Sequence, residues 1–298
     1  GGCAYRTLMP EEELHLKEGQ IFRLFQAELS EGDGEALGTI PNPADPGDLK
    51  PVFEGILPSP VYDTYRNKME FTFGDEKKDG EMQLGMHERG SFFNIVTVDQ
   101  CRIVDGDVQK ILREVLLFAR ESGLPYYHRT GHTGIFRHLL IRKAFYSGEI
   151  LVDLVTSSQG ESAGQDAGDG NEDNAGEHPG KGQKPDLQAL TDRLLKLDLQ
   201  GRITGILNTV NDHVADAVIN DRTDLIYGRD YIVEKLLNLS FKITPFSFFQ
   251  TNTRGAEVLY ETVRRYVGDT KGKVIFDLYS GTGTIAQILA PTAEHVTG

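Results

Sequence analysis

The sequence predicts an α+β domain over residues 6–245, followed by the first part of an α/β, Rossmann-like domain over residues 246–298. Two observations predict this division. Before residue 245, short strands and isolated helices follow one another without the strand–helix–strand repeat of a parallel sheet. After it, residues 273–290 have the pattern of a buried strand, a tight glycine turn and a helix, with which a doubly wound sheet begins. A chain of 298 residues has room for two domains of ordinary size.

Apolar periodicity places the elements of the α+β domain. A helix is expected from Pro10 to about Ser30, and residues 32–49, rich in Gly, Pro and Asp, are expected to form a loop. Residues 65–74 alternate as a half-buried strand with apolar side chains on one face. The further elements expected are a hairpin over 84–98, a helix capped by Asp107 and ended by Gly123, a hairpin over 139–156, a helix over 186–197, a strand over 205–210 and short strands over 231–243.

Residues 157–185 differ from the rest of the chain in composition. They carry six acidic residues against two lysines and contain almost nothing apolar. Such a segment cannot bury enough surface to order itself, so we expect a disordered acidic insertion. The whole chain has a net charge of −14, from 45 acidic and 31 basic residues, which by composition alone weighs slightly against a nucleic-acid partner. Without the insertion the balance is milder, so a local basic face stays open.

The glycine turn has the spacing G-x-G-x-x-A, formed by Gly281, Gly283 and Ala286. The first glycine permits a sharp turn, the second lets backbone approach a ligand, and the small third residue lets the helix pack close to the strand. Asp277 ends the strand, and its carboxylate suits a cationic ligand group better than a pyrophosphate. By itself the pattern also fits an ordinary crossover, or the nicotinamide site of a Rossmann oxidoreductase.

The stretch before the turn narrows the choice. Residues 246–253 read FSFFQTNT, and an amphipathic helix is expected over residues 255–267. With this phrase and the DLYSGTGT turn, the chain resembles the RNA uracil-5-methyltransferase family, the S-adenosylmethionine enzymes that methylate C5 of uridine in ribosomal and transfer RNA. The resemblance covers essentially the whole chain. It implies that a class I methyltransferase domain begins at residue 246 and that residues 6–245 form a central RNA-binding domain.

The resemblance implies two sets of binding residues. In the Rossmann-like part, S-adenosylmethionine would be contacted by Gln250, Asp277, Tyr279, Gly281, Gly283 and Thr284. Tyr279 stands where the family often has phenylalanine, which keeps an aromatic ring for stacking. In the strand that contains YRNK, the residues implied to contact RNA or the active site are Arg66, Asn67 and Lys68. The spacing of these three residues alone fits a solvated strand edge equally well.

The two cysteines, Cys3 and Cys101, are too few for a disulfide scaffold. On the residues alone they are unrelated thiols, one of them in a core. The resemblance implies instead that residues 1–5 are the tail of a cysteine-rich motif and that both cysteines ligate a [4Fe–4S] cluster in the full-length protein, because thiolates at four positions suit such a cluster. No apolar run is long enough to span a membrane, so no membrane contact is expected. With only two cysteines the default expectation is a cytoplasmic protein, and a monomer is expected.

Residues 127–138 are rich in histidine and arginine. Glycines within this stretch argue against the fixed spacing of a metal site, so we interpret it as a loop that leads into an edge strand. RNA contact through Arg129 and Arg137 is a secondary expectation. His87, alone on its strand, is expected to be structural.

The expected function is S-adenosylmethionine-dependent methylation of C5 of a specific uridine in RNA, with ribosomal RNA favoured over transfer RNA. In the family a cysteine thiolate adds to C6 and a general base later removes the C5 proton. Neither group matches a residue of this chain, so we expect a fragment truncated at both ends and inactive alone, with catalytic residues beyond Gly298. The alternatives are a non-catalytic RNA-binding or iron–sulfur module and, against Asp277 and the FFQTNT phrase, a nicotinamide-dependent oxidoreductase.

Overall fold

The computed structural model describes residues 7–31, 53–160, 182–214, 218 and 220–298. The chain divides into two compact units at the boundary between residues 62 and 63. The first unit contains helix α1 (Pro10–Glu31), which confirms the helix expected after Pro10. Three glutamates, Glu11 to Glu13, lie in its first turn, where their negative charges interact favourably with the positive end of the helix dipole. The loop expected over residues 32–49 lies outside the described residues.

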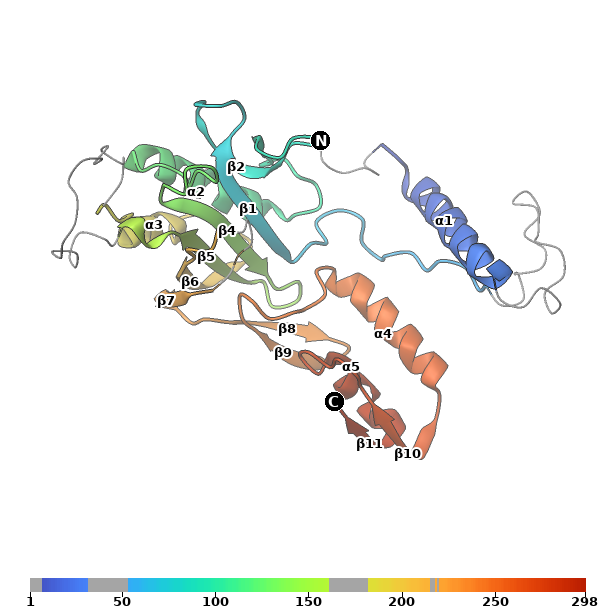
Figure 1. Cartoon of the computed structure of the whole chain (residues 1–298). Helices are drawn as coiled ribbons and strands as arrows, with labels where there is room; N and C mark the ends of the chain where they lie inside the picture. The colour runs from blue at the N-terminus through green and yellow to red at the C-terminus, as the bar shows by residue number, and fades with distance from the viewer. Residues whose placement is uncertain (1–6, 32–52, 161–181, 215–217, 219) are drawn as a thin grey trace, which may run out of the picture. The chain divides into compact units, whose positions relative to one another are not determined.

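The second unit is built on a seven-stranded sheet with the order β3-β2-β1-β4-β5-β6-β7 (Figure 1). Its strands are β1 (Lys68–Asp75), β2 (Met82–His87), β3 (Ile95–Thr97), β4 (Phe136–Lys143), β5 (Glu149–Thr156), β6 (Arg202–Val210) and β7 (Arg222–Gly228). The two expected hairpins are confirmed as β2–β3 and β4–β5. Met69, Phe71 and Phe73 of β1 are buried, as their alternation predicts.

Two features of this sheet differ from the sequence prediction. Strands β5 and β6 pair in parallel, so the region before residue 245 is not free of parallel pairing. The connection between them includes the short 3-10 helix η1 (Ser158–Gly160) and helix α3 (Leu187–Leu194), with Asp186 as N-cap. Residues 161–181 of the predicted acidic insertion lie outside the described part, and its disorder stays a prediction. Strand β7 was not expected, because its side chains do not alternate between apolar and polar as a half-buried strand would.

One face of the sheet is covered by helix α2 (Gly106–Ser122). Its N-cap is Asp105, not Asp107: the backbone of Asp105 is extended, and its carboxylate accepts a hydrogen bond from the Asp107 backbone N at 2.8 Å. Gly123 ends the helix in the left-handed conformation (φ 68°), as predicted. The buried stripe of α2 packs with β1, β4 and β5 in the larger core, through residues such as Ile111, Leu112 and Val115.

A second core joins elements on both sides of residue 245. The hairpin β8 (Ile232–Leu236) and β9 (Leu239–Ile243) packs with helix α4 (Thr253–Val267) and helix α5 (Thr284–Leu289). Leu151 and Leu207 of the seven-stranded sheet belong to the same cluster. The predicted helix over residues 255–267 is confirmed, and Asn252 caps it by accepting a hydrogen bond from Gly255 N at 2.8 Å.

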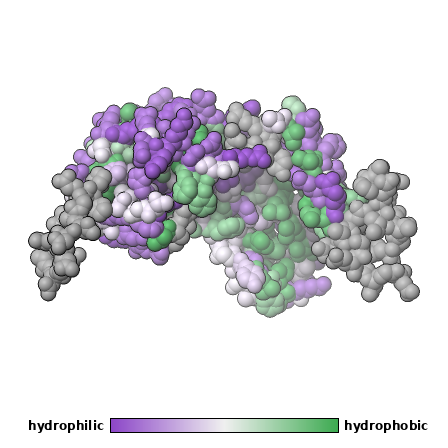
Figure 2. Space-filling model, turned by 45° about the horizontal axis from the view of Figure 1, so that its top comes forward, coloured by the Kyte–Doolittle hydropathy of each residue, from purple (hydrophilic) through white to green (hydrophobic). Residues whose placement is uncertain are grey.

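The C-terminal elements form a strand–helix–strand unit. Strand β10 (Thr270–Phe276) leads through the glycine turn into α5, and the 3-10 helix η2 (Ala290–Thr292) leads into β11 (Ala293–Thr297), which pairs with β10 in parallel. Strand β10 and its turn carry exposed apolar side chains: Val274 at 53%, Phe276 at 67% and Leu278 at 77%. Figure 2 shows the hydrophilic surface over the sheet and the gathering of apolar side chains over the C-terminal part. Among the described residues, no helix combines the length and apolar character needed to cross a membrane.

Candidate cofactor and RNA site

The glycine turn takes the conformation that its spacing predicts. Gly281 (φ 55°) and Gly283 (φ 68°) both have left-handed backbones, and Gly283 is the N-cap of α5. Gly283 N donates a hydrogen bond to Ser280 O at 2.8 Å, which closes the turn. Left-handed backbone favours glycine, because a Cβ would be strained there. The turn therefore brings the end of β10 against the start of α5. A Cβ at Gly281 would lie 3.8 Å from Tyr279 O and one at Gly283 would lie 3.6 Å from Gln287 Nε2, both at ordinary van der Waals distance.

Asp277 has a structural role at this turn. Its Oδ2 accepts a hydrogen bond from Ala286 N, in the first turn of α5, at 3.0 Å. Its backbone N donates to Thr297 O of β11 at 2.7 Å. Because α5 has no side-chain cap at Gly283, the Asp277 carboxylate supplies one of the acceptors that the first amides of a helix require. One carboxylate oxygen thus holds the turn, and the carboxylate stays half-buried beside it.

Tyr279 is the most exposed aromatic residue described, at 104%. Its φ of 62° lies in the left-handed region, which is uncommon for a residue with a bulky side chain. The chain therefore accepts backbone strain and full exposure of the ring at the same position. Strained residues of this kind cluster at ligand sites.

Tyr260 of α4 brings two of the predicted cofactor residues together. The ring is buried, and burial raises the pKa of Tyr260, a hydrogen bond with the Gln250 side chain lowers it, and the Asp277 carboxylate raises it again. Gln250 and Asp277 therefore approach the same phenol from different segments. The periodicity of residues 255–267 predicts only an amphipathic helix there, because burial of the Tyr260 hydroxyl group beside polar partners leaves no trace in the spacing. Thr284 is buried, with its Oγ1 2.9 Å from Thr282 Oγ1.

The start of β1 is hydrogen-bonded to the segment that contains Gln250. Asn67 N donates to Thr251 O at 2.8 Å, and Asn67 Nδ2 donates to Gln250 O at 2.9 Å. Arg66 forms an isolated antiparallel bridge with Asn252. The structure therefore places the predicted RNA-contact residues directly beside a predicted cofactor-contact residue. Asn67 is only 8% exposed, with its amide hydrogens used inside the protein, so its contact with RNA stays a prediction.

Arg66 and Lys68 present charged groups beside Asn67. Arg66 Nε donates to Lys68 O at 3.0 Å, and Lys68 Nζ lies 2.6 Å from Glu70 Oε1. The Glu70 side chain is 43% exposed, so this ion pair is solvated and contributes little to stability. A phosphate can replace such a partner at small cost, and contact of these two residues with RNA likewise stays a prediction.

A buried polar network continues from Asn67 into the second core. Asn67 Nδ2 also donates to Thr253 Oγ1 at 2.9 Å, and Thr253 Oγ1 donates to Glu234 Oε2 at 2.9 Å. Glu234 further accepts hydrogen bonds from Phe145 N at 2.6 Å and Tyr146 N at 3.1 Å. Burial raises the pKa of Glu234, and these hydrogen bonds oppose that rise. The network joins β1, the β4–β5 turn, β8 and α4.

Arg142 fixes residues 245–247, which lead into the segment that contains Gln250. Its side chain is 1% exposed, its Nε donates to Pro245 O at 2.9 Å, and its Nη2 donates to Ser247 O. Burial lowers the pKa of Arg142 to about 10. No pattern in the sequence predicts this role, because an arginine in a strand is ordinarily solvated.

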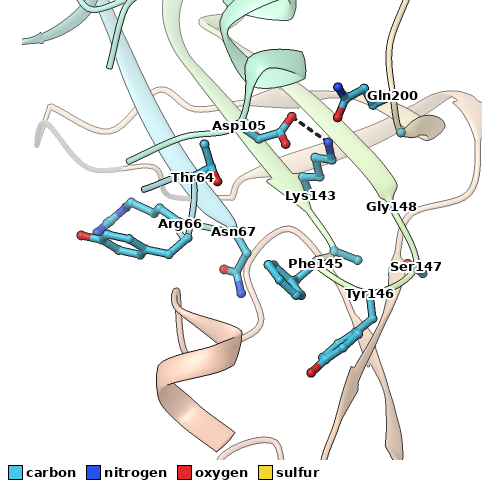
Figure 3. A pocket seen from close by; sticks show the side chains of 13 residues that line it. Thr64, Arg66, Asn67, Asp105, Lys143, Phe145, Tyr146, Ser147, Gly148 and Gln200 are labelled. Atoms are coloured by element: carbon cyan, nitrogen blue, oxygen red, sulfur yellow. Dashed lines mark hydrogen bonds and ion pairs between the residues drawn. The ribbon is translucent and has the colours of Figure 1, made fainter. Parts of the chain in front are cut away.

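A pocket of about 310 Å³ opens beside the junction (Figure 3). On one side Lys143 Nζ contacts Asp105 Oδ1 at 2.6 Å and Asp107 Oδ2 at 2.7 Å, so its charge is compensated. On another side Asn67 points toward α4, and none of the described residues donates a hydrogen bond to its buried Oδ1. Arg66 also lines the pocket and supplies a cationic group there, whereas the Asn67 Oδ1 is buried away from it.

Asp107 anchors the wall of this pocket. It accepts hydrogen bonds from Gln200 N at 2.9 Å and Gly201 N at 2.7 Å in addition to Lys143. Burial by itself raises the pKa of Asp107, but Lys143 and the two backbone amides outweigh it and hold the pKa below its usual value. Asp107 is thus a structural carboxylate that connects α2 to the start of β6.

The cysteines do not form a metal site in the described part of the chain. Cys101 is half-buried and packs against the core that contains α2, and its backbone N donates a hydrogen bond to Val98 O at 3.1 Å. Cys3 lies outside the described residues. Within those residues, no group of three or more His, Cys, Asp or Glu side chains is arranged to hold a metal ion. The chain has two cysteines, so it does not supply the four thiolates of a [4Fe–4S] cluster.

Comparison with known proteins points to enzymes that act on RNA. No protein-family model matches the chain. It is 43% identical over 298 residues to an uncharacterized RNA methyltransferase of Clostridium tetani, 41% over 300 residues to one of Clostridium acetobutylicum, and 38% over 298 residues to one of Caldanaerobacter subterraneus subsp. tengcongensis. Each match includes 100% of this chain but only 56–57% of the relative. The chain thus spans just over half the length of these relatives.

A solved structure shares the fold. The chain matches the tRNA (uracil-54, C5)-methyltransferase of Pyrococcus abyssi in complex with S-adenosyl-L-homocysteine with a TM-score of 0.63 at 23% identity. The match covers 97% of this chain and 56% of that chain. The mixed sheet and the following strand–helix–strand unit are therefore an arrangement that also occurs in a methyltransferase.

Proposed function

We propose that this chain is part of an RNA methyltransferase that transfers the methyl group of S-adenosylmethionine to C5 of a uridine. The observation that carries the proposal is the similarity of the whole chain, at 38–43% identity, to three RNA methyltransferases. The likeness in fold to a uracil methyltransferase that holds S-adenosyl-L-homocysteine supports both the cofactor and the position on the base. Ribosomal RNA is the first substrate to test and transfer RNA is its competitor.

The site fits S-adenosylmethionine, which supplies an electrophilic methyl group when bound. Gly281 is exposed and Gly283 is half-buried, so adenosine has access to the backbone of the turn. The Tyr279 ring is exposed for stacking, and the Asp277 carboxylate offers negative charge toward a cationic methionine group. Gln250, held by Asn67 and by the Tyr260 hydroxyl, orients the ligand from the opposite segment.

On the RNA side we propose that Arg66 and Lys68 contact phosphate next to the target nucleotide. A target base stacked inside RNA has to be extruded before an enzyme can reach its C5 atom. The nucleophilic thiolate and the base that the family resemblance implies are not assigned to Cys3, Cys101 or any other residue of this chain. We further propose that the natural polypeptide is a cytoplasmic monomer, and that Cys3 and Cys101 are two of the ligands of its iron–sulfur cluster.

The proposal is tested with the natural polypeptide, S-adenosylmethionine labelled in its methyl group, and separate ribosomal and transfer RNA preparations that lack modification. We expect the labelled methyl group to enter one of the two RNAs. In a second assay, RNA that carries tritium at C5 of its uridines is expected to release tritium, because the methyl group replaces the C5 hydrogen. Transfer of label without loss of tritium would place the methyl group on another atom. Absence of transfer to either RNA would refute the enzyme assignment.

A further inference from the structure

The turn between β2 and β3 presents two aromatic rings to solvent. Phe92 is 74% exposed and Phe93 is 60% exposed. The rings meet edge to face, with centroids 5.7 Å apart and an interplanar angle of 76°. Single exposed apolar residues are common on protein surfaces, but two adjacent exposed phenylalanines in ring contact form a patch.

Hydrogen bonds within the turn hold these rings in place. Ser91 Oγ accepts from Phe93 N at 3.4 Å and from Asn94 N at 3.1 Å. Asn94 Nδ2 donates to Glu88 Oε2 at 2.9 Å, and Glu88 N donates to Asn94 O at 2.9 Å. Because the turn is already ordered, a ligand that binds the rings pays little conformational entropy.

Arg129 reaches the turn from the loop that precedes β4. Its Nη1 donates to Phe92 O at 3.2 Å, and its Nη2 lies 2.7 Å from His87 Nε2. The guanidinium carbon is 5.8 Å from the centroid of the Phe92 ring. Arg129, which the sequence predicts as a secondary RNA contact, therefore lies beside Phe92 and Phe93, which the sequence prediction does not single out. The same contacts give His87 a structural role as the partner of Arg129.

The charge and position of the patch indicate its partner. Arg129 lies beside the Phe92 ring, and the turn itself carries Arg89 and Glu88, although the chain as a whole has a net charge of −14. Strands β1 and β2 are antiparallel, so the last residues of β2, which lead into the turn, lie next to the first residues of β1, which begins with Lys68. A flat ring beside a guanidinium matches the base and phosphate of an unpaired nucleotide, since bases stack on aromatic side chains and phosphates attract arginine.

We propose that Phe92, Phe93 and Arg129 form a stacking platform for an unpaired base of the RNA substrate. This rests on the proposed function, and it adds that the substrate is bound at a loop or single-stranded segment that reaches beyond the target nucleotide. The rings supply sequence-tolerant stacking, and Arg129 supplies charge at the rim. Arg66 and Lys68 contact the same RNA nearer to the cofactor.

The test uses the natural polypeptide and two RNA probes, one with an unpaired loop on a stem and one with the same stem as a closed duplex. The double variant Phe92→Ala and Phe93→Ala is expected to raise Kd for the loop probe by about 5-fold to 100-fold, the range for loss of base stacking. Binding of the duplex probe and of S-adenosylhomocysteine is expected to change less than about 2-fold, because neither uses the rings. Phe93→Tyr keeps a ring and is expected to bind like wild type.

Tyr227→Ala is the matched control, because Tyr227 is an exposed aromatic residue on β7, at the opposite edge of the sheet. Equal loop-probe affinity in the double variant and wild type would overturn the platform, and so would an equal loss for loop and duplex. The two proposals fail separately. A wild-type protein that binds the loop probe through these rings but transfers no methyl group would keep the platform and refute the enzyme.

Discussion

Replacement of Thr253 by valine tests the network that joins β1 to the cofactor-side segment. Thr253 is 1% exposed, and its hydroxyl group accepts a hydrogen bond from Asn67 Nδ2 and donates one to Glu234 Oε2, both at 2.9 Å. Valine has nearly the same shape, so Thr253→Val removes these two hydrogen bonds without opening a cavity. It leaves a buried amide hydrogen of Asn67 without that acceptor and the Glu234 carboxylate with one donor fewer.

The expected cost follows from the chemistry of the two bonds. A hydrogen bond to a charged group contributes about 1.5–3 kcal/mol, and a buried polar group left without a partner costs about 1–3 kcal/mol. Because Glu234 keeps its backbone donors and Asn67 keeps Gln250, we expect Thr253→Val to lower the free energy of unfolding by about 2–4 kcal/mol at neutral pH. Burial raises the pKa of Glu234, and loss of the Thr253 donor raises that pKa further.

The pH dependence has a definite sign. A carboxyl group with a raised pKa in the folded state favours folding at low pH, and this contribution is lost as pH rises through the folded pKa. The deficit of Thr253→Val is therefore largest at neutral pH and shrinks as Glu234 becomes protonated. Equilibrium urea unfolding followed by circular dichroism, at neutral and mildly acidic pH, measures both quantities.

Two variants serve as controls for this measurement. Thr253→Ser keeps the hydroxyl group and is expected to lose less than half as much stability. Thr262→Val lies on the same helix, where the Thr262 hydroxyl donates only to Val258 O, a carbonyl group of the helix, and it is expected to cost less than about 1 kcal/mol. If Thr253→Val costs no more than Thr262→Val at either pH, the network does not stabilise the junction.

Three further substitutions are predicted from single sites. Burial raises the pKa of Asp153 to about 6, and none of the described residues donates to its Oδ1. Asp153→Asn should therefore stabilise the protein by about 1–3 kcal/mol above that pH. In urea titrations this advantage should disappear as pH falls toward 3.8. Asp107→Asn should lower the free energy of unfolding by about 2–4 kcal/mol. This loss should decrease when the pH falls through the lowered pKa of Asp107, because the wild-type carboxylate is then protonated as well. A loss that stays constant with pH would argue against the ion pair with Lys143 as its cause. Tyr279→Gly should raise the melting temperature slightly, by relief of about 1 kcal/mol of left-handed strain, and weaken S-adenosylhomocysteine binding in calorimetry; unchanged binding would remove Tyr279 from the site.

Most elements of the fold were predictable because their signals are local. The alternation of Met69, Phe71 and Phe73 predicts a strand with one buried face, and Gly123 predicts the end of α2. The sequence predicts the cap of α2 two residues too late, because Asp105 and Asp107 are both good caps by type and only the burial of Asp107 distinguishes them. The parallel pairing of β5 and β6 was missed, since pairing depends on how the connection folds and not on either strand alone.

The candidate site was predictable as motifs but not as an arrangement. The glycine spacing predicts the turn, and the resemblance selects Gln250, Asp277 and Tyr279. Nothing in the spacing shows that Asn67 donates to the backbone of Gln250, or that Asp277 supplies an acceptor to the first turn of α5. Such contacts join residues distant in sequence, and their formation depends on the packing of two cores.

The hydrogen bond between Asn67 and Gln250 connects residues 183 positions apart. Closure of so long a loop carries an entropic cost that the short hairpins β4–β5 and β8–β9 do not have. The hairpins can form as soon as they are synthesised. Arg66 N and Asn67 O likewise pair with Ile103 O and Lys143 N, whereas the bonds from Asn67 to Gln250 and Thr251 have to wait for the segment before α4. The contact between the start of β1 and residues 250–252 therefore forms late, on a strand that is already paired with β4.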